Sequence, residues 1–314
     1  MGSYRMLHLD SKGLQPYAAG LRALERDILY PLADGEDQFY IDHGPDYHPF
    51  FSTLGQAHFL VALGEGAGEG AAEVVGNMVA VRRRALLASR PIDTFYMCDY
   101  KIAPKHRGGA LTRRFWMTAL GRLAVDERLW GWTLVYGAAM RGRQGDVMHS
   151  VRKRRLHPGA LFAPAAHLNL YFTNPQMLAG LDPTHCPPPP QMHTGLDLSV
   201  AAYNQPAGLE STHGRKDLRR ISTGQPWSMT HLSQGPACWH PTWGHYLQRS
   251  GQRLLDTGQE HTTAAFAIDD RLKDHQRWLK GQGLTPDSVC TIYILSLPHI
   301  IRQASWIHLA TSEI

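Results

Sequence analysis

One short loop carries the chemistry that the sequence indicates most clearly. A predicted strand over residues 94–103 runs into a loop with two adjacent glycines, Gly108 and Gly109, and the loop opens an amphipathic helix over residues 110–125. The first turn of a helix has unpaired backbone N–H groups and a partial positive charge from the helix dipole. Glycines let a ligand approach that backbone closely. The loop predicts a pyrophosphate site, and an ordinary strand–loop–helix connection is the alternative.

The sequence around this loop resembles the acyl-CoA-binding motif of the GNAT superfamily of N-acyltransferases. That motif follows a strand ending in a hydrophobic–x–Pro pattern, which Ile102-Ala103-Pro104 matches, and it starts with Arg or Gln, which Arg107 matches. Ala110 and Thr112 replace its two later glycines, but the backbone N–H groups survive both replacements. The resemblance implies a donor site formed by Ile102, Arg107, Gly108, Gly109, Ala110, Leu111 and Thr112.

The resemblance also implies a fold, an α/β domain with a central mixed sheet flanked by helices. Residues 4–173 follow the order of strands and helices found in the superfamily. The strands at 94–103 and 132–139 are then parallel neighbours, because a helix connects them. They are expected to splay at their C-terminal ends and admit the thioester arm of the donor.

Periodicity and turn signals predict the other elements. Strands are expected at 4–9, 58–64, 74–87, 167–173, 262–268, 291–297 and 306–310, helices at 14–32, 145–155 and 271–280, and a long connection at 33–56.

A run of four prolines after Cys186 predicts a linker. The chain is therefore divided into a GNAT-like domain over residues 1–182, a linker over 183–195 and a C-terminal α/β lobe over 196–314. The lobe is either a degenerate GNAT-like repeat or an unrelated α/β extension. We expect it to wall the acceptor site and to hold no second donor site.

The resemblance implies direct attack of an amine on the thioester within a ternary complex. Asp99, on the strand before the motif, is the predicted base or a binder of the cationic amine, and a structural salt bridge is the alternative. Protonation of the departing thiolate is assigned to His149 or Tyr136, although a thiolate also leaves without an acid, and a structural role is the alternative for both residues.

Composition limits the classes of protein. The chain has 314 residues, of which 43% are hydrophobic and 19% charged, which is typical of a globular protein. It has no long apolar run, no signal-peptide pattern and four widely spaced cysteines, so a cytoplasmic protein with free thiols and no membrane partner is expected. The histidine-rich segments lack zinc spacing, so no metal is predicted.

The net charge of +5 suits anionic ligands, but no nucleic-acid-reading motif is present, and no nucleic-acid partner is expected. The predicted function is transfer of an acyl group to an amine of a small molecule, amino acid or peptide. The donor is acetyl-CoA, a longer acyl-CoA or an acyl carrier protein. A GNAT-like module that binds CoA without turnover and acts through a partner is the alternative.

Overall fold

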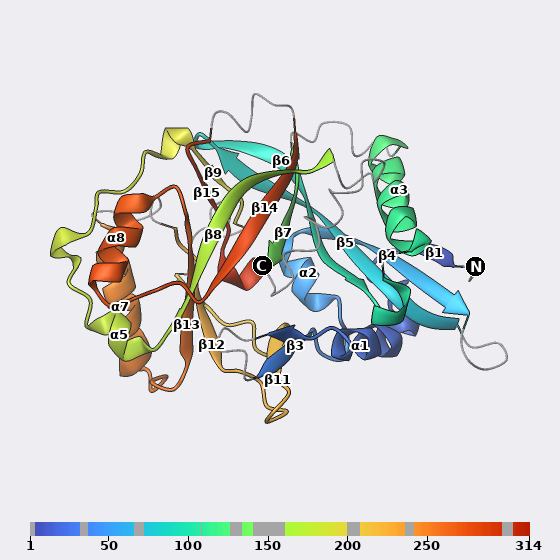
Figure 1. Ribbon diagram of the computed structural model, residues 1–314, viewed down its shortest axis with the longest axis horizontal. Helices are drawn as coiled ribbons and strands as arrows, with labels where there is room; N and C mark the ends of the chain where they lie inside the picture. Colours follow the sequence, from blue (N-terminus) through green and yellow to red (C-terminus); the bar gives the residue numbers. More distant parts are fainter. Residues whose placement is uncertain are drawn as a thin grey trace.

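A single mixed sheet runs through the molecule in the computed structural model (Figure 1), which describes residues 4–31, 37–65, 72–107, 109–125, 134–140, 161–199, 208–235, 242–296 and 304–314. The sheet has 12 strands, ten of them in the order β1-β4-β5-β6-β7-β14-β8-β13-β12-β10, with β9 paired to β5 and β15 paired to β9. Its strands are β1 Arg5–Leu9, β4 Gln56–Glu65, β5 Ala72–Leu87, β6 Arg90–Ile102, β7 Leu134–Met140, β8 Ala163–Thr173, β9 Gly195–Asp197, β10 Leu209–Glu210, β12 Met229–Leu232, β13 Thr263–Asp269, β14 Ser288–Ser296 and β15 Trp306–His308.

Helices and a small second sheet surround this sheet. The α-helices described are α1 Ala18–Arg26, α2 Pro49–Leu54, α3 Ala110–Val125, α5 Pro175–Ala179, α7 Trp243–Asp256 and α8 Lys273–Gly281. The second sheet consists of β2 Tyr30–Pro31, β3 Gln38–Asp42 and β11 Asp217–Arg220 in the order β11-β3-β2. Figure 1 shows α5, α7 and α8 grouped at one end of the molecule and α3 toward the other.

The two faces of the sheet bury different helices. Alternate residues of β4 point to opposite faces, and Val61 belongs to the core that holds α1 and α2, whereas Leu60 and Ala62 belong to the core that holds α3. On the α3 side, Leu111 and Phe115 are fully buried, which explains why their helical spacing predicted this helix. A third core packs α5, α7 and α8 against β8 and β13.

Strands from the two ends of the sequence interleave in the sheet. Strand β14 lies between β7 and β8 and is antiparallel to both. Parallel pairs flank this centre on each side, β6–β7 connected through α3 and β12–β13 connected through α7. The strand next to β7 is β14, which comes from the C-terminal half of the chain, and the strand next to β13 is β8, which comes from the N-terminal half. The two halves therefore share a strand arrangement around β14 and β8, and the sheet continues across the predicted linker.

The structure confirms the predicted mixed α/β fold and corrects some elements. The predicted helix over 14–32 is α1, and it is shorter because a 3₁₀ turn, Gln15–Tyr17, precedes it and β2 follows it. The predicted connection over 33–56 contains β3 and α2, which bury Phe50 and Phe51. The helix expected at 145–155 lies outside the described residues.

Candidate active site

Strand β6 carries a bulge at Asp99. Asn77 pairs with Lys101 across β5 and β6, and the next pair along the strands is Val79 with Cys98. One β5 residue therefore lies opposite two β6 residues, and Asp99 has a left-handed backbone conformation with φ of 48°. A bulge bends its strand and redirects a side chain, and Asp tolerates positive φ better than most residues.

The redirected Asp99 carboxylate lies in a cluster of polar side chains. Its Oδ1 accepts a hydrogen bond from Lys101 Nζ. Its Oδ2 accepts from the Tyr47 hydroxyl and from Asn77 Nδ2, the latter at 3.0 Å. Asn77 Oδ1 is buried, and it has no hydrogen-bond partner among the described residues. A buried acceptor without a donor costs about 1–3 kcal/mol, so a ligand that supplies a donor would be favoured beside Asp99.

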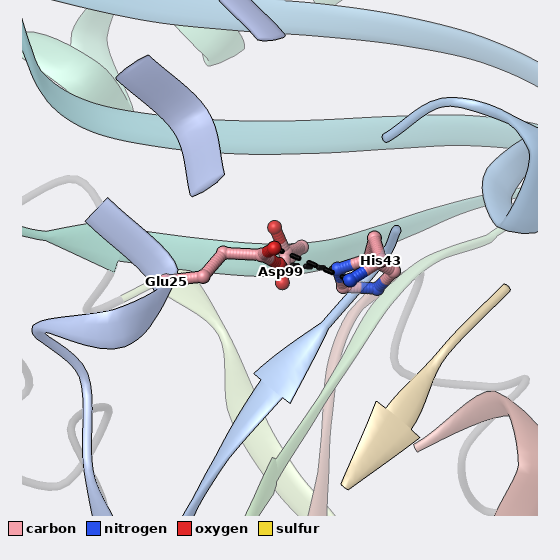
Figure 2. Close-up of side chains that lie close together, drawn as sticks. All are labelled: Glu25, His43 and Asp99. Carbon is pink, nitrogen blue, oxygen red and sulfur yellow. Dashed lines mark hydrogen bonds and ion pairs between the residues drawn. The ribbon is translucent and has the colours of Figure 1, made fainter. Parts of the chain in front are cut away.

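A second carboxylate completes the cluster. Glu25 of α1 binds His43 Nδ1 and, at 3.1 Å, Lys101 Nζ through Oε1, and its Oε2 accepts from the His43 backbone N–H at 3.2 Å. Figure 2 shows Glu25 of α1, Asp99 of β6 and His43, which follows β3, pointing toward one another. Atoms of these three side chains that could bind a metal lie within 4.8 Å of one another. Because Lys101 Nζ bonds to both carboxylates, the cluster has an internal cation between the groups that would otherwise hold a metal ion.

The pairing fixes the charges of Asp99 and Lys101. Burial acts to raise the pKa of Asp99, but Lys101, His43 and hydrogen bonds from Lys101 and Tyr47 lower it to about 2. Burial acts to lower the pKa of Lys101, but Asp99 and Glu25 outweigh it and raise that pKa. Both groups are therefore ionised at neutral pH. The stability linked to Asp99 is complete above its ordinary pKa of 3.8 and is lost as the pH falls through about 2.

Strands β6 and β7 separate next to this cluster. They pair in parallel from Thr94–Leu134 to Met97–Gly137, which confirms that they are parallel neighbours. Past that point, in the part of both strands that the structure describes, β6 pairs only with β5 and β7 only with β14. The predicted splay is therefore present, and the bulge at Asp99 lies where the gap opens.

The predicted donor loop lies at the end of β6. A 3₁₀ turn, Pro104–His106, follows the strand. Arg107 Nε donates to the Ile102 carbonyl at 3.0 Å, so this arginine stabilises the end of β6. Helix α3 begins at Ala110, as predicted.

The start of α3 is open to solvent. Gly109 and Ala110 are exposed, Thr112 is half-buried, and Leu111 is buried in the core beneath. A Cβ on Gly109 would meet no atom within 4 Å, so there is free space beside the backbone at the helix start. Gly108 lies outside the described residues.

Of the two predicted acids, Tyr136 lies in the part of the chain that the structure describes and His149 does not. Tyr136 is fully buried on β7, stacks on Tyr96 with ring centroids 4.8 Å apart, and donates to the Leu198 carbonyl at 3.3 Å. Burial raises the pKa of Tyr136. It belongs to the α1 side of the core and does not contact the Asp99 cluster through any interaction described. His149 lies outside the described residues, so its assignment stays a prediction.

A cleft of about 1620 Å³ adjoins the cluster. Tyr30 is part of its lining, and the pKa of Tyr30 is raised first by burial and is also affected by Lys101, Asp99 and Glu25, which places this end of the cleft beside the cluster. Met140, at the end of β7, also lines it. Most of the other lining residues come from the C-terminal half, including Lys216, Trp227, His231, Thr263 and Ile314.

Asp99 was predicted from the sequence, but Glu25, Lys101 and Asn77 were not. Glu25 had a usable signal, since it lies on the same helical face as Leu21, Leu24 and Ile28, and a carboxylate on an apolar face needs a partner. Segment 42–51, which supplies His43 and Tyr47, was interpreted as a polar loop, and the family resemblance placed it near the acceptor site. Lys216 had no local signal, because its burial depends on contacts with distant segments.

The described residues include no helix long and apolar enough to cross a membrane. Cysteines 98, 186 and 290, which the structure describes, form no disulfide with one another.

Comparisons with known proteins identify the fold and no close relative. No protein-family model matches the chain, and no curated protein matches it. Among solved structures, the chain is similar to Saccharomyces cerevisiae N-myristoyltransferase with bound myristoyl-CoA, at 9% identity and a TM-score of 0.51, over 97% of this chain and 84% of that one.

Two other solved structures are similar over most of their length. A tandem GNAT protein from the clavulanic acid biosynthesis pathway gives 11% identity and a TM-score of 0.46, over 93% of this chain and 98% of that one. A GCN5-related N-acetyltransferase from Sphaerobacter thermophilus gives 12% identity and a TM-score of 0.42, over 93% and 95%. At such identities a likeness concerns the fold alone. The fold is of the GNAT type, with the parallel β6–β7 pair, its splay and α3 in the expected order.

Proposed function

We propose that this protein is an N-acyltransferase that moves an acyl group from acyl-CoA to an amine by direct attack in a ternary complex. The observation that carries the proposal is the gap between β6 and β7. The bulge with Asp99 lies where the two strands stop pairing, and the solvent-exposed start of α3 follows the end of β6. Such a gap offers unpaired strand edges to an extended pantetheine arm. The fold likeness to a protein with bound myristoyl-CoA agrees with an acyl-CoA donor, as an analogy.

The donor would lie with its pyrophosphate at residues 107–112. The N–H groups at the start of α3 and the helix dipole favour an anion there, and the open space beside Gly109 leaves room for it. Arg113 and Arg114 are exposed in the first turn and add positive charge near the phosphates. Acetyl-CoA and longer acyl-CoAs carry this pyrophosphate, whereas an acyl carrier protein would present the single phosphate of its pantetheine arm there.

Replacing Gly109 with Val should lower CoA affinity at least about tenfold without unfolding the protein. The new Cβ meets no atom within 4 Å, so the main effect of the substitution is to fill the space proposed for phosphate. Calorimetric titration of CoA measures the affinity. Gly121→Ala is the matched control, since Gly121 lies later in α3 with equally open space, and it should leave CoA binding unchanged. Normal CoA affinity in the folded Val variant would exclude this loop.

The acceptor would enter through the cleft and meet the thioester beside Asp99. At about 1620 Å³ the cleft exceeds the 300–1,000 Å³ typical of small-molecule sites, which favours an amine on a larger molecule such as a peptide. The C-terminal half supplies most of its lining, in keeping with the prediction that this half walls the acceptor site.

Asp99 would hold the positive charge of the amine. Its carboxylate is ionised throughout the working pH range, and attack on the thioester places positive charge on the amine nitrogen. A fixed anion in a buried site stabilises that charge far more than it would in water. Asn77 Oδ1, which has no donor among the described residues, lies on the same cluster and would accept an N–H of the amine.

The chain should bind one CoA, not two. The second parallel pair, β12–β13, also ends early, at His231–Ala265, but residues of the same chain fill the space beyond it. Thr311 Oγ1 donates to the Ala265 carbonyl at 3.2 Å, and His308 Nε2 is 3.1 Å from the Ser233 carbonyl oxygen. Calorimetry with CoA should give a stoichiometry of one per chain, and a value of two would contradict the assignment of a single donor gap.

The proposed activity is tested with the purified full chain, acetyl-CoA and longer acyl-CoAs, and a panel of amino acids and peptides with free amines. We expect amine-dependent release of CoA thiol and a product heavier by the acyl group. Tight CoA binding without transfer to any amine would favour a CoA-binding module instead.

A further inference from the structure

A proton must leave the attacking amine, and Asp99 is poorly suited to accept it. All the Asp99 hydrogen bonds described come from Lys101, Tyr47 and Asn77, and its pKa is lowered to about 2 by Lys101 against the effect of burial. A carboxylate with so low a pKa is a weak base near neutral pH. Another group beside the cleft is needed for this step.

The nearby hydroxyl and thiol groups are also unsuitable. Burial raises the pKa of Tyr47, Cys98 and Tyr96, so all three keep their protons at neutral pH. Each donates a proton to an acceptor more readily than it takes one up. His43 is held against Glu25 inside the cluster and does not line the cleft.

Lys216 lies where the cleft meets the cluster. It lines the cleft, is 8% exposed, and precedes β11 directly. Its Nζ donates to the Ser312 carbonyl at 3.3 Å and to the backbone oxygen of Ile314. The same nitrogen lies 4.9 Å from the centre of the Phe50 ring, which packs against His43. Two backbone oxygens and a ring hold this ammonium, and the hydrogen bonds described for it include none to a side-chain carboxylate.

The charges around Lys216 suit a group that changes its protonation. Burial lowers the pKa of Lys216 to about 8, although Asp99 and Cys98 act to raise it. The other groups that face it are Lys101 on β6, which acts to lower this pKa, and Glu313 in the turn after β15, which acts to raise it. His231 on β12 has a pKa lowered to about 3 by burial and by Lys216, so it is uncharged near neutral pH.

We propose that Lys216 is the general base of the transfer reaction, an inference that rests on the proposed acyltransferase function. The neutral amine of the acceptor attacks the thioester carbonyl carbon, a C–N bond forms and the C–S bond breaks. The amine proton passes to the uncharged Nζ of Lys216, and CoA departs as the thiolate. The Lys216 ammonium then returns the proton to the thiolate or to water, and Asp99 stays ionised throughout.

The test compares Lys216→Arg and Lys216→Met with the wild type across pH 6 to 10. For the wild type, kcat at saturating acceptor should rise with pH around a midpoint near pH 8. Arg keeps the charge and cannot lose its proton, so both variants should lose about 10²–10⁴-fold in kcat and lack that rise, with CoA affinity unchanged. Lys273→Met, on the exposed face of α8 and outside the cleft, is the control and should behave as wild type.

A second readout does not require turnover. The chain has seven lysines, so carbon-13 labelled lysine gives few Cε signals to follow by NMR, and the signal lost in Lys216→Met identifies Lys216. Its titration midpoint should lie near pH 8, while an ordinary lysine titrates near 10.4. A midpoint at 10 or above, or an Arg variant with wild-type turnover and pH profile, would overturn the role of Lys216. Absence of transfer by the wild type to any amine would instead sink the proposed function itself.

Discussion

Replacing Asp99 with Asn should lower kcat/KM for the acceptor by about 10²–10³-fold, the scale seen when one preorganised electrostatic contact is removed from a reaction centre. Asn keeps the size of the side chain and removes its charge. The developing positive charge on the amine then faces Lys101 without the anion that offsets it. CoA affinity should not change, because residues 107–112 are untouched. Steady-state kinetics and calorimetry measure the two effects.

Asp93→Asn is the matched control. Asp93 lies on the same strand, its side chain is 43% exposed, and its ion pair with Arg84 is long, at 3.9 Å. Its replacement should leave kinetics unchanged. A rise in acceptor KM alone in the Asp99 variant would limit Asp99 to attracting the amine. A lower thermal midpoint with normal kinetics would show a structural salt bridge and contradict the proposed role.

The second large effect concerns stability. Arg83 on β5 is buried and binds Glu313 Oε2 at 2.5 Å and the Leu198 carbonyl, with its guanidinium 5.4 Å from the centre of the Tyr96 ring. These contacts join the N-terminal strands to the last residues described. Replacing Arg83 with Met leaves the Glu313 carboxylate buried without this partner, which should cost about 3–5 kcal/mol of unfolding free energy.

Arg84→Met is the control for this loss, because it removes the neighbouring arginine of the same strand. Arg84 is 54% exposed and its ion pair with Asp93 is long, so the expected cost is at most about 1 kcal/mol. Urea unfolding of both variants measures the difference. Equal losses for the two would contradict the account of how the two ends of the chain are joined.

Local patterns predicted the elements whose own residues determine them. Leu111 and Phe115 recur at helical spacing and are buried under α3, so the start of this helix was predicted correctly. The parallel β6–β7 pair followed from the helix that connects the strands. The prediction of a simple connection over 33–56 was wrong, because this segment contains β3, which pairs with the distant strand β11.

The site was predictable only in part for the same reason. Asp99 was found because it lies on the strand before the loop, but its bulge depends on the register with β5. Lys101 and Glu25 become a pair only after α1 packs on the sheet. Lys216 becomes a buried amine only when residues 312–314 and Phe50 surround it. The interleaving of β14 between β7 and β8 has no counterpart in any local pattern.

A crystal structure with bound acetyl-CoA tests the central claim most directly. The account predicts one molecule per chain, with the pyrophosphate on the N–H groups at the start of α3. The thioester should enter the gap that opens after Met97 and Gly137, on the side of Asp99 and the cleft. Acetyl-CoA bound outside that gap, with β6 and β7 left empty of ligand, would contradict it.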